Sequence, residues 1–138
     1  MKLVDIYHTP EAARILYRLL EEREPTVNIG HRRMPTWDEH LAFIKSNPYS
    51  AWYLIEDTEK FIGAAYLTKA NEIGTFIFRA EQGAGFGPRA IRLLMDRHPR
   101  PRYLANINPL NERSTRMFER LGFHHIQNTY ELLKDVGT

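Results

Sequence analysis

A glycine-rich turn between a strand pattern and a helix pattern is the feature that most constrains this chain. The turn is Gln82–Gly87, with glycine at three alternate positions. Residues 73–78 before it are mostly β-branched or aromatic, as in a strand. After it, Pro88 suits the first position of a helix, because proline has no N–H to lose there. Such a turn points backbone N–H groups outward at the positive end of a helix dipole, which favours an anion such as a pyrophosphate.

The residues after the turn narrow the choice of ligand. A P-loop requires Lys followed by Ser or Thr after its last glycine, whereas this chain has Pro88 and Arg89. A dinucleotide fingerprint requires a small residue in place of Pro88 and an acidic residue about 20 positions further on. Residues 103–106 hold no acid. Two interpretations stay open at this point: a turn that binds a phosphorylated cofactor, and a glycine-rich turn that binds nothing.

A second segment, residues 108–123, has the pattern of a strand end, a capped helix and a stop. Asn111 can cap the helix, and Gly122 can end it. Between them, Met117, Phe118 and Leu121 form an apolar stripe at helical spacing. Taken alone, the segment is equally well an ordinary helix packed on a sheet.

Together and in this order, the two segments resemble the GNAT superfamily of acyl-CoA-dependent N-acetyltransferases. The turn is similar to the pyrophosphate loop Q/R-x-x-G-x-G/A of that family, and the second segment to its C-terminal motif N-x-N-x-x-S/A…F/Y-E-x-x-G-F. The resemblance extends over nearly the whole chain in the order and length of the elements. It implies acetyl-CoA as the cofactor, with contacts from Ile77, Phe78, Gln82, Gly83, Ala84, Gly85, Phe86, Gly87, Asn111 and Phe118.

The order of patterns along the chain predicts an α+β fold in a single domain, residues 1–138. We expect a mixed, mostly antiparallel sheet of about six or seven strands, flanked by about four helices. Strands are predicted at 3–7, 51–56, 61–68, 72–78 and 103–107, with one or two more in 123–133. Helices are predicted to begin near Thr9, Thr36, Pro88 and Asn111. The proposed apolar sides are Ala13, Leu16, Leu19 and Leu20 on the first helix and Leu41, Phe43 and Ile44 on the second.

The predicted strands at 72–78 and 103–107 are joined by a helix. Such a crossover makes them parallel. The family resemblance adds that this parallel pair splays apart around the pantetheine arm of the cofactor.

Composition excludes several classes of protein. The chain has no cysteine, which rules out disulfides, thiolate metal sites and a cysteine nucleophile, and we expect no metal. No apolar run approaches a membrane span and no secretory segment is visible, so a cytoplasmic location is expected. The net charge of +2 is too small to indicate nucleic acid as a partner. A homodimer is a possible assembly.

Acetyl transfer to an amine requires a held cofactor, a polarised carbonyl, a base and a stabilised thiolate. By resemblance, a backbone N–H near Ile77 or Phe78 polarises the carbonyl. Glu72 is the leading candidate for the base, since several family members carry a glutamate at the matching place. His31 is the competing base, because imidazole titrates near neutral pH. For either residue the alternative is a solvated side chain without a role.

No residue is assigned to the last requirement, stabilisation of the departing thiolate. Many family members place a tyrosine acid where this chain has Phe118, and phenylalanine cannot donate a proton. Residues predicted to contact the amine substrate are His31, Arg32, Met34, Trp37, Trp52 and Glu72. Arginines beside aromatic rings suit a phosphate together with a sugar or base. Segments 35–40 and 47–49 also resemble family members that modify amino-sugars on nucleotide carriers.

We therefore predict an N-acetyltransferase that moves an acetyl group from acetyl-CoA to a primary amine of a small molecule. A nucleotide-linked amino-sugar is one candidate acceptor. Transfer is expected to be direct, because the chain has no cysteine and no evident serine–histidine pair. Two alternatives stay open: acetylation of a protein or peptide, and a CoA-binding module that has lost catalysis, which the departure at Phe118 would allow.

Overall fold

A computed structural model describes residues 1–23 and 33–134 of the chain. The secondary structure is, in order, β1 (Lys2–Asp5), η1 (Ile6–His8), α1 (Ala12–Glu22), α2 (Trp37–Lys45), β2 (Tyr49–Asp57), β3 (Lys60–Thr68), β4 (Ile73–Ile77), η3 (Arg79–Glu81), α3 (Phe86–Arg97) and α4 (Glu112–Arg120). Within the described ranges, no helix is both long and apolar enough to cross a membrane.

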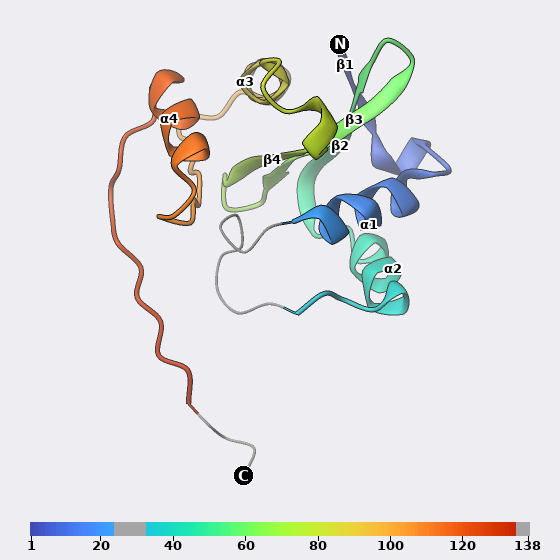
Figure 1. Cartoon of the computed structure of the whole chain (residues 1–138), viewed down its shortest axis with the longest axis horizontal. Coiled ribbons are helices and arrows are strands. Elements are labelled where there is room, and N and C mark those ends of the chain that lie inside the picture. Colours follow the sequence, from blue (N-terminus) through green and yellow to red (C-terminus); the bar gives the residue numbers. More distant parts are fainter. Residues whose placement is uncertain (24–32, 135–138) are drawn as a thin grey trace.

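The sheet is an antiparallel meander in the order β1-β2-β3-β4 (Figure 1). The predicted turn between β2 and β3 is confirmed. Its central residues, Thr58 and Glu59, both have positive φ, at 46° and 65°. Two such residues in succession give a turn whose twist matches that of the paired strands.

Side chains alternate between two layers of packing on the sheet. On β2, Leu54 packs with the buried residues of α1, while its neighbours Tyr53 and Ile55 pack with those of α3. This alternation is the period of two expected for a strand buried on both faces. Figure 1 shows α1 and α2 on one side of the sheet and α3 on the other.

The predicted capping box of α2 is confirmed, whereas its predicted apolar side is partly wrong. The Thr36 hydroxyl accepts from the Glu39 N–H, and the Glu39 carboxylate accepts from the Thr36 N–H. Ile44 packs against the core, but Phe43 is 45% exposed and the buried residue is His40. The His40 ring forms a hydrogen bond through Nε2 with the Ala13 carbonyl at 2.8 Å. A helix-to-helix hydrogen bond, which periodicity cannot predict, therefore orients α2.

The apolar side of α1 is shifted relative to the prediction. The buried residues are Ala12, Ile15, Leu16 and Leu19. Leu16 and Leu19 were predicted, whereas Ala13 and Leu20 are only partly buried. The Ala13 carbonyl instead faces α2 through its contact with His40.

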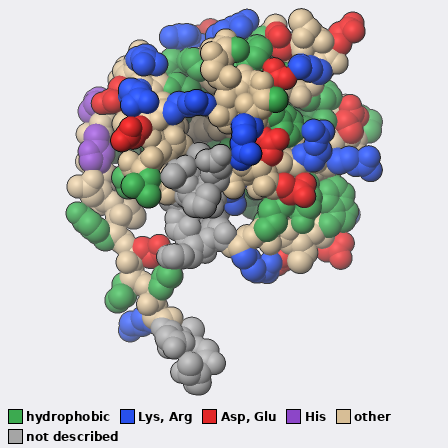
Figure 2. Space-filling model, viewed as in Figure 1, with side chains coloured by type: hydrophobic (Ala, Val, Ile, Leu, Met, Phe, Trp, Pro, Cys, Tyr) green, Lys and Arg blue, Asp and Glu red, His purple; other side chains and the backbone are tan. Residues whose placement is uncertain are grey.

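The prediction of about six or seven strands is wrong, because the described residues form a sheet of four. Residues 103–107 contribute one isolated bridge at Leu104, and 123–134 contribute no strand. This last segment leads away from the body of the domain (Figures 1 and 2) and leaves Tyr130 89% exposed. Its composition suits a strand, but a ladder also requires a neighbouring strand, which local pattern does not encode.

Candidate active site

The glycine loop ends in the N-terminus of α3. Gly83 and Gly85 have φ of 88° and 82°, the left-handed region that glycine adopts without steric cost. Gly85 is the N-cap of α3, no side chain among the described residues caps that end, and the first turn of the helix contains no acid. The helix begins at Phe86, so Pro88 is its third residue and not its first as predicted. The N–H that Pro88 lacks is still one of the first few of a helix, which have no partner within the helix. The geometry therefore fits an anion.

Gln82 ties this loop to two other elements. Its Nε2 donates to the Ile77 carbonyl at the end of β4, at 3.1 Å. Its Oε1 accepts from Nη1 of Arg113 on α4, at 2.7 Å. The side chain therefore holds the loop in place between β4 and α4, since both of its polar atoms are engaged.

Gly87 lies where the loop, β4 and α4 meet. A β-carbon at this position would lie 3.1 Å from the Met117 sulfur and 3.8 Å from Oγ1 of Thr75. Close approach to Met117, not an unusual φ, therefore explains glycine here. Met117 was predicted only as part of an apolar stripe, and Thr75 only as part of a strand. Neither had a signal that linked it to the loop.

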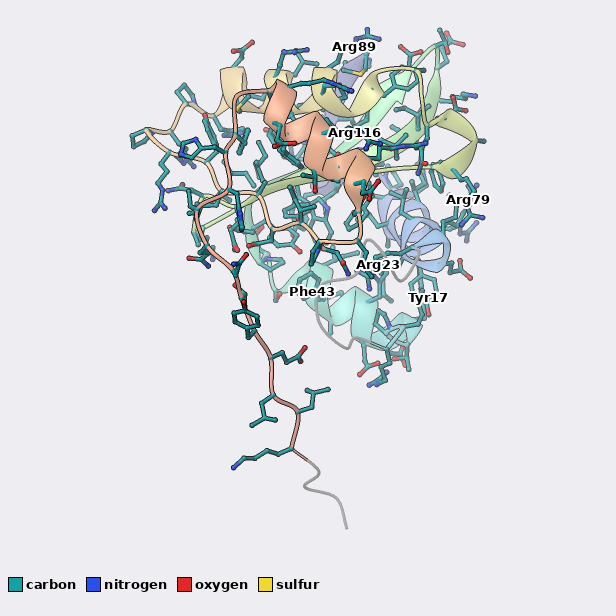
Figure 3. The ribbon with its side chains drawn as sticks, turned by 60° about the vertical axis from the view of Figure 1, so that its left-hand side comes forward. Tyr17, Arg23, Phe43, Arg79, Arg89 and Arg116 are labelled. Carbon is teal, nitrogen blue, oxygen red and sulfur yellow. The ribbon has the colours of Figure 1, made fainter. Side chains whose placement is uncertain are left out.

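Three elements that adjoin the loop carry arginines, one of which, Arg79, donates to the Glu22 carbonyl of α1. Figure 3 labels Arg79 of η3, Arg89 of α3 and Arg116 of α4. The Arg89 guanidinium lies 5.7 Å from the centre of the Phe86 ring, and Arg116 pairs with Glu112 at 3.7 Å. Their positive field favours a polyanionic ligand near the loop.

The predicted parallel pair is present, but it is joined at one point. The Ile73 N–H donates to the Leu104 carbonyl, and the Leu104 N–H donates to the Asn71 carbonyl, both at 2.8 Å. These bonds form a parallel bridge between Glu72 and Leu104. Strand β4 continues to Ile77, and within the described residues its pairing on this side ends at the bridge. The two segments therefore part beyond Leu104.

Beyond the bridge, β4 and the segment after Leu104 leave an opening between them. Alternation along β4 decides which peptide groups face this opening. Thr68 donates to the Glu72 carbonyl and Phe78 donates to the Ile62 carbonyl, so residues at even positions bond to β3. The peptide groups of Thr75 and Ile77 then face the other edge, as that of Ile73 does. Of the two predicted donors, Ile77 therefore faces the opening, while the N–H of Phe78 belongs to the sheet.

Glu72 lies at the bridge where the opening begins. Its side chain extends on the same face of the sheet as Gly74 and Phe76, the face covered by α1. The carboxylate accepts hydrogen bonds from the Thr68 hydroxyl, at 3.2 Å, and from the Asn106 amide. A carboxylate at this place can accept a proton from an amine that approaches from the α1 side.

Aromatic rings line the same face beside Glu72. The Tyr66 side chain lies across Gly74. A β-carbon added at Gly74 would lie 2.5 Å from the Tyr66 hydroxyl. Tyr66 stacks on Tyr49 with ring centres 5.0 Å apart, and Tyr49 contacts the edge of Trp52 at 4.7 Å. Of these rings, Trp52 is one of the residues predicted to contact the substrate, and it is half-buried against the α1 side of the core.

The predicted acceptor residues that the structure describes lie in two places. Trp52 and Glu72 lie on the α1 face of the sheet, whereas Met34 and Trp37 lie just before and at the start of α2. Trp37 is 42% exposed and packs edge-on against Tyr17 of α1, with ring centres 5.3 Å apart; Met34 is also exposed. His31 and Arg32 lie outside the described residues.

The neighbouring Arg33 is bound to Glu39. Its guanidinium donates to both carboxylate oxygens, at 2.9 and 2.7 Å. These hydrogen bonds, with those from Thr36, lower the pKa of Glu39 to about 2. The charge of Arg33 is therefore shared with a carboxylate and is less available for a substrate phosphate.

The structure places the last two predicted cofactor residues in α4. Asn111 caps the helix, with its side-chain oxygen 3.1 Å from the Ser114 N–H. Phe118 is buried in the core and meets the Phe123 ring edge-on at 5.1 Å. Core packing is therefore sufficient to explain Phe118, and the cofactor contact that the family resemblance implies for its ring is left to experiment.

A family model described as an acetyltransferase (GNAT) domain matches residues 3–124. The chain belongs to the GNAT acetyltransferase family. The predicted resemblance is thus confirmed, and an acyltransferase is the class of enzyme that GNAT membership supports. A search of curated protein sequences finds no match to the chain.

Solved structures of GNAT proteins share the fold. A putative GNAT-family acetyltransferase from Bordetella pertussis has a TM-score of 0.70 and 21% identity, over 94% of this chain and 87% of that one. A putative acetyltransferase from Salmonella typhimurium, solved with its cofactor acetyl-CoA, has a TM-score of 0.65 and 20% identity, over 88% and 77%. A spermidine N-acetyltransferase chimera from Vibrio cholerae and hSSAT has a TM-score of 0.72 and 18% identity, over 92% of this chain and 84% of that one. At these identities the likeness shows the fold.

Proposed function

We propose that this protein transfers an acetyl group from acetyl-CoA to a primary amine of a small molecule. The observation that carries the proposal is one juxtaposition at the β4 edge of the sheet. The N-terminus of α3, which no side chain caps, adjoins a strand edge whose parallel partner has parted from it. An anion site beside an open strand edge suits a long ligand with a phosphorylated end.

The residues present fit acetyl-CoA. Backbone N–H groups of residues 83–87 would hold its pyrophosphate. The peptide groups of Thr75 and Ile77 would meet its pantetheine arm, with the Ile77 N–H as donor to the thioester carbonyl. When bound, acetyl-CoA supplies an acetyl group activated as a thioester. One structural neighbour is described as solved with acetyl-CoA as its cofactor, which supports this choice.

Glu72 would act as the base. A primary amine is protonated near neutral pH and must lose a proton before it can attack a carbonyl. The Glu72 carboxylate can take that proton directly or through a water molecule. His31, the competing base, lies outside the described residues, so the two candidates are separated by experiment.

A small molecule is the acceptor that the comparisons support. Three of the structural neighbours are described as spermidine or spermidine/spermine N-acetyltransferases. Aromatic rings lie on the same face of the sheet as Glu72, and such rings suit the binding of a cationic amine. The nucleotide-linked amino-sugar has less support, because Arg33, next to the predicted acceptor residue Arg32, is bound to Glu39 and is less available for a phosphate.

The test is acetyl transfer to a panel of amines, followed by release of free CoA thiol and by the mass of the product. The panel contains spermidine, a nucleotide-linked amino-sugar and a peptide with a free α-amine. We expect an N-acetyl product from a small molecule, strongly reduced in Glu72→Gln. Acetylation of the peptide alone would replace the proposed acceptor, and binding of acetyl-CoA without any product would indicate a CoA-binding module.

A further inference from the structure

We propose that Asn106 and Thr68 are positioning residues, which hold the Glu72 carboxylate from two sides in the orientation that proton transfer requires. The proposal rests on the proposed function, in which Glu72 is the base. Neither residue carried a functional signal in the sequence, and both enter through their contacts with the Glu72 side chain.

The Thr68 hydroxyl is fixed as a donor to Glu72. Its oxygen accepts from the Glu72 N–H at 2.9 Å and from the Ala70 N–H at 3.2 Å. A hydroxyl has two lone pairs and one proton, so two accepted bonds leave the proton to be donated. The remaining contact of this hydroxyl is with Oε1 of Glu72, at 3.2 Å. The turn from β3 to β4 therefore sets the direction of that proton.

Asn106 holds the other carboxylate oxygen from the opposite strand. Its Nδ2 donates to Oε2 of Glu72. Asn106 follows Leu104 by two positions, and the bridge between Leu104 and Glu72 fixes the register of the two segments. The carboxylate is therefore tied to the end of β3 through Thr68 and to the segment after Leu104 through Asn106, at the point where the parallel pair opens.

Both donors are uncharged. In the part of the chain that the structure describes, no Lys or Arg forms an ion pair with Glu72. A cation beside the carboxylate would repel an approaching ammonium group. A hydroxyl and an amide orient the carboxylate without this repulsion. With one bond accepted at each oxygen, a second lone pair on each stays able to accept a proton.

Orientation is what these two contacts add to the base. A free glutamate side chain populates several rotamers, and fixing it costs up to about 2 kcal/mol of conformational entropy. Here the fold has already restricted the side chain before the amine arrives. Because a reacting group displaced by about 1 Å can lose about 10²-fold in rate, loss of either contact is expected to lower kcat.

The test is a double-mutant cycle between Asn106→Leu and Glu72→Gln. Leucine has nearly the size of asparagine and no donor. We expect Asn106→Leu to lower kcat about 10–10²-fold and to leave the Kd for acetyl-CoA unchanged. In the Glu72→Gln background the same change should have little further effect, because the base that it positions is already lost.

A comparison of kcat with folding stability separates positioning from a structural role. Loss of a positioning contact should lower kcat while the free energy of unfolding and the Kd for acetyl-CoA change little. Loss of a merely structural contact would lower the free energy of unfolding without lowering kcat of the folded enzyme. Thr68→Val and Thr68→Ser form the second pair, in which the serine hydroxyl should restore most of the activity that valine loses. This pair also serves if Asn106→Leu does not fold.

The outcomes distinguish two failures. If Glu72→Gln turns over like the parent, Glu72 is not the base, and the mechanism in the proposed function fails with this inference. If Glu72→Gln is impaired while Asn106→Leu and Thr68→Val keep the parental kcat, only the inference is overturned. Losses in kcat that multiply in the double mutant would also overturn it, since they would show that Asn106 acts independently of Glu72.

Discussion

Leu104 and Glu72 form a single parallel bridge, and the two chain segments that they belong to part directly beyond it. In an ordinary crossover unit the parallel ladder would continue along β4 to Ile77. Here the peptide groups of Thr75 and Ile77 face away from β3, toward the glycine loop side of the sheet. The bridge therefore fixes where the proposed base lies relative to the proposed cofactor site.

The first prediction concerns Gly85. Valine at this position, where φ is 82°, should abolish the rise in melting temperature caused by acetyl-CoA. For the parent, ligand at 100 times its Kd should add about 2.7 kcal/mol to the free energy of unfolding. The measurement is a thermal melt with and without acetyl-CoA.

Gly122 supplies the matched control. Its φ is 101°, and a β-carbon there, as at Gly85, would meet nothing within 4 Å. Both valine variants should therefore lose similar stability, about 1–2 kcal/mol, from left-handed backbone strain. Only Gly85→Val should lose the response to acetyl-CoA, and an equal response in the two variants would place the cofactor elsewhere.

The second prediction concerns Glu72. Replacement by glutamine should lower kcat by about 10²–10⁴-fold, the usual contribution of a general base, while the Kd for acetyl-CoA changes little. Glu59→Gln, at an exposed carboxylate in the β2–β3 turn, is the control and should behave as the parent. If His31→Ala loses activity and Glu72→Gln does not, the base is His31.

The third prediction concerns Phe118, whose ring is buried against Phe123. Phe118→Ala should destabilise the domain by about 3–5 kcal/mol, because it leaves a cavity in the core. The Kd for acetyl-CoA, measured well below the melting temperature, should change little. A large increase in Kd with a small loss of stability would show instead that the ring contacts the cofactor.

The fourth prediction concerns the pH dependence of stability at the N-terminus of α2. Hydrogen bonds from Arg33 and Thr36 lower the pKa of Glu39 to about 2, so the charged form is favoured in the folded state. The resulting stability is present above the unfolded pKa, near 4.3, and is lost as pH falls toward 2. Urea midpoints of the parent and Glu39→Gln should therefore differ at pH 7 and converge in acid. A difference that is constant with pH would contradict this account.

Features that depend on neighbouring residues could be predicted from the sequence. The Thr36–Glu39 capping box, the Asn111 cap and the glycine loop each involve residues within a few positions of one another, so their patterns are visible in the chain. The family motifs are of the same local kind. This is why the loop and its helix were placed nearly correctly, with an error of two residues at Pro88.

Features that depend on distant residues could not be predicted. The burial of His40 follows from a carbonyl 27 positions away, and the hydrogen bond from Asn106 reaches Glu72 across 34 positions. Gly87 meets Met117 only because α4 folds back beside the loop. The strand pattern of residues 123–133 failed for the same reason, since strand propensity does not supply a partner.

The central claim is that an open strand edge beside the glycine loop presents acetyl-CoA to an amine deprotonated by Glu72. The most direct test measures the N-acetyl product formed from acetyl-CoA and the amine panel by the parent, Gly85→Val, Glu72→Gln and Glu59→Gln. The account predicts a small-molecule product with the parent and Glu59→Gln, and strongly reduced amounts with the other two. Product formation that is unaffected in Glu72→Gln and Gly85→Val would contradict it.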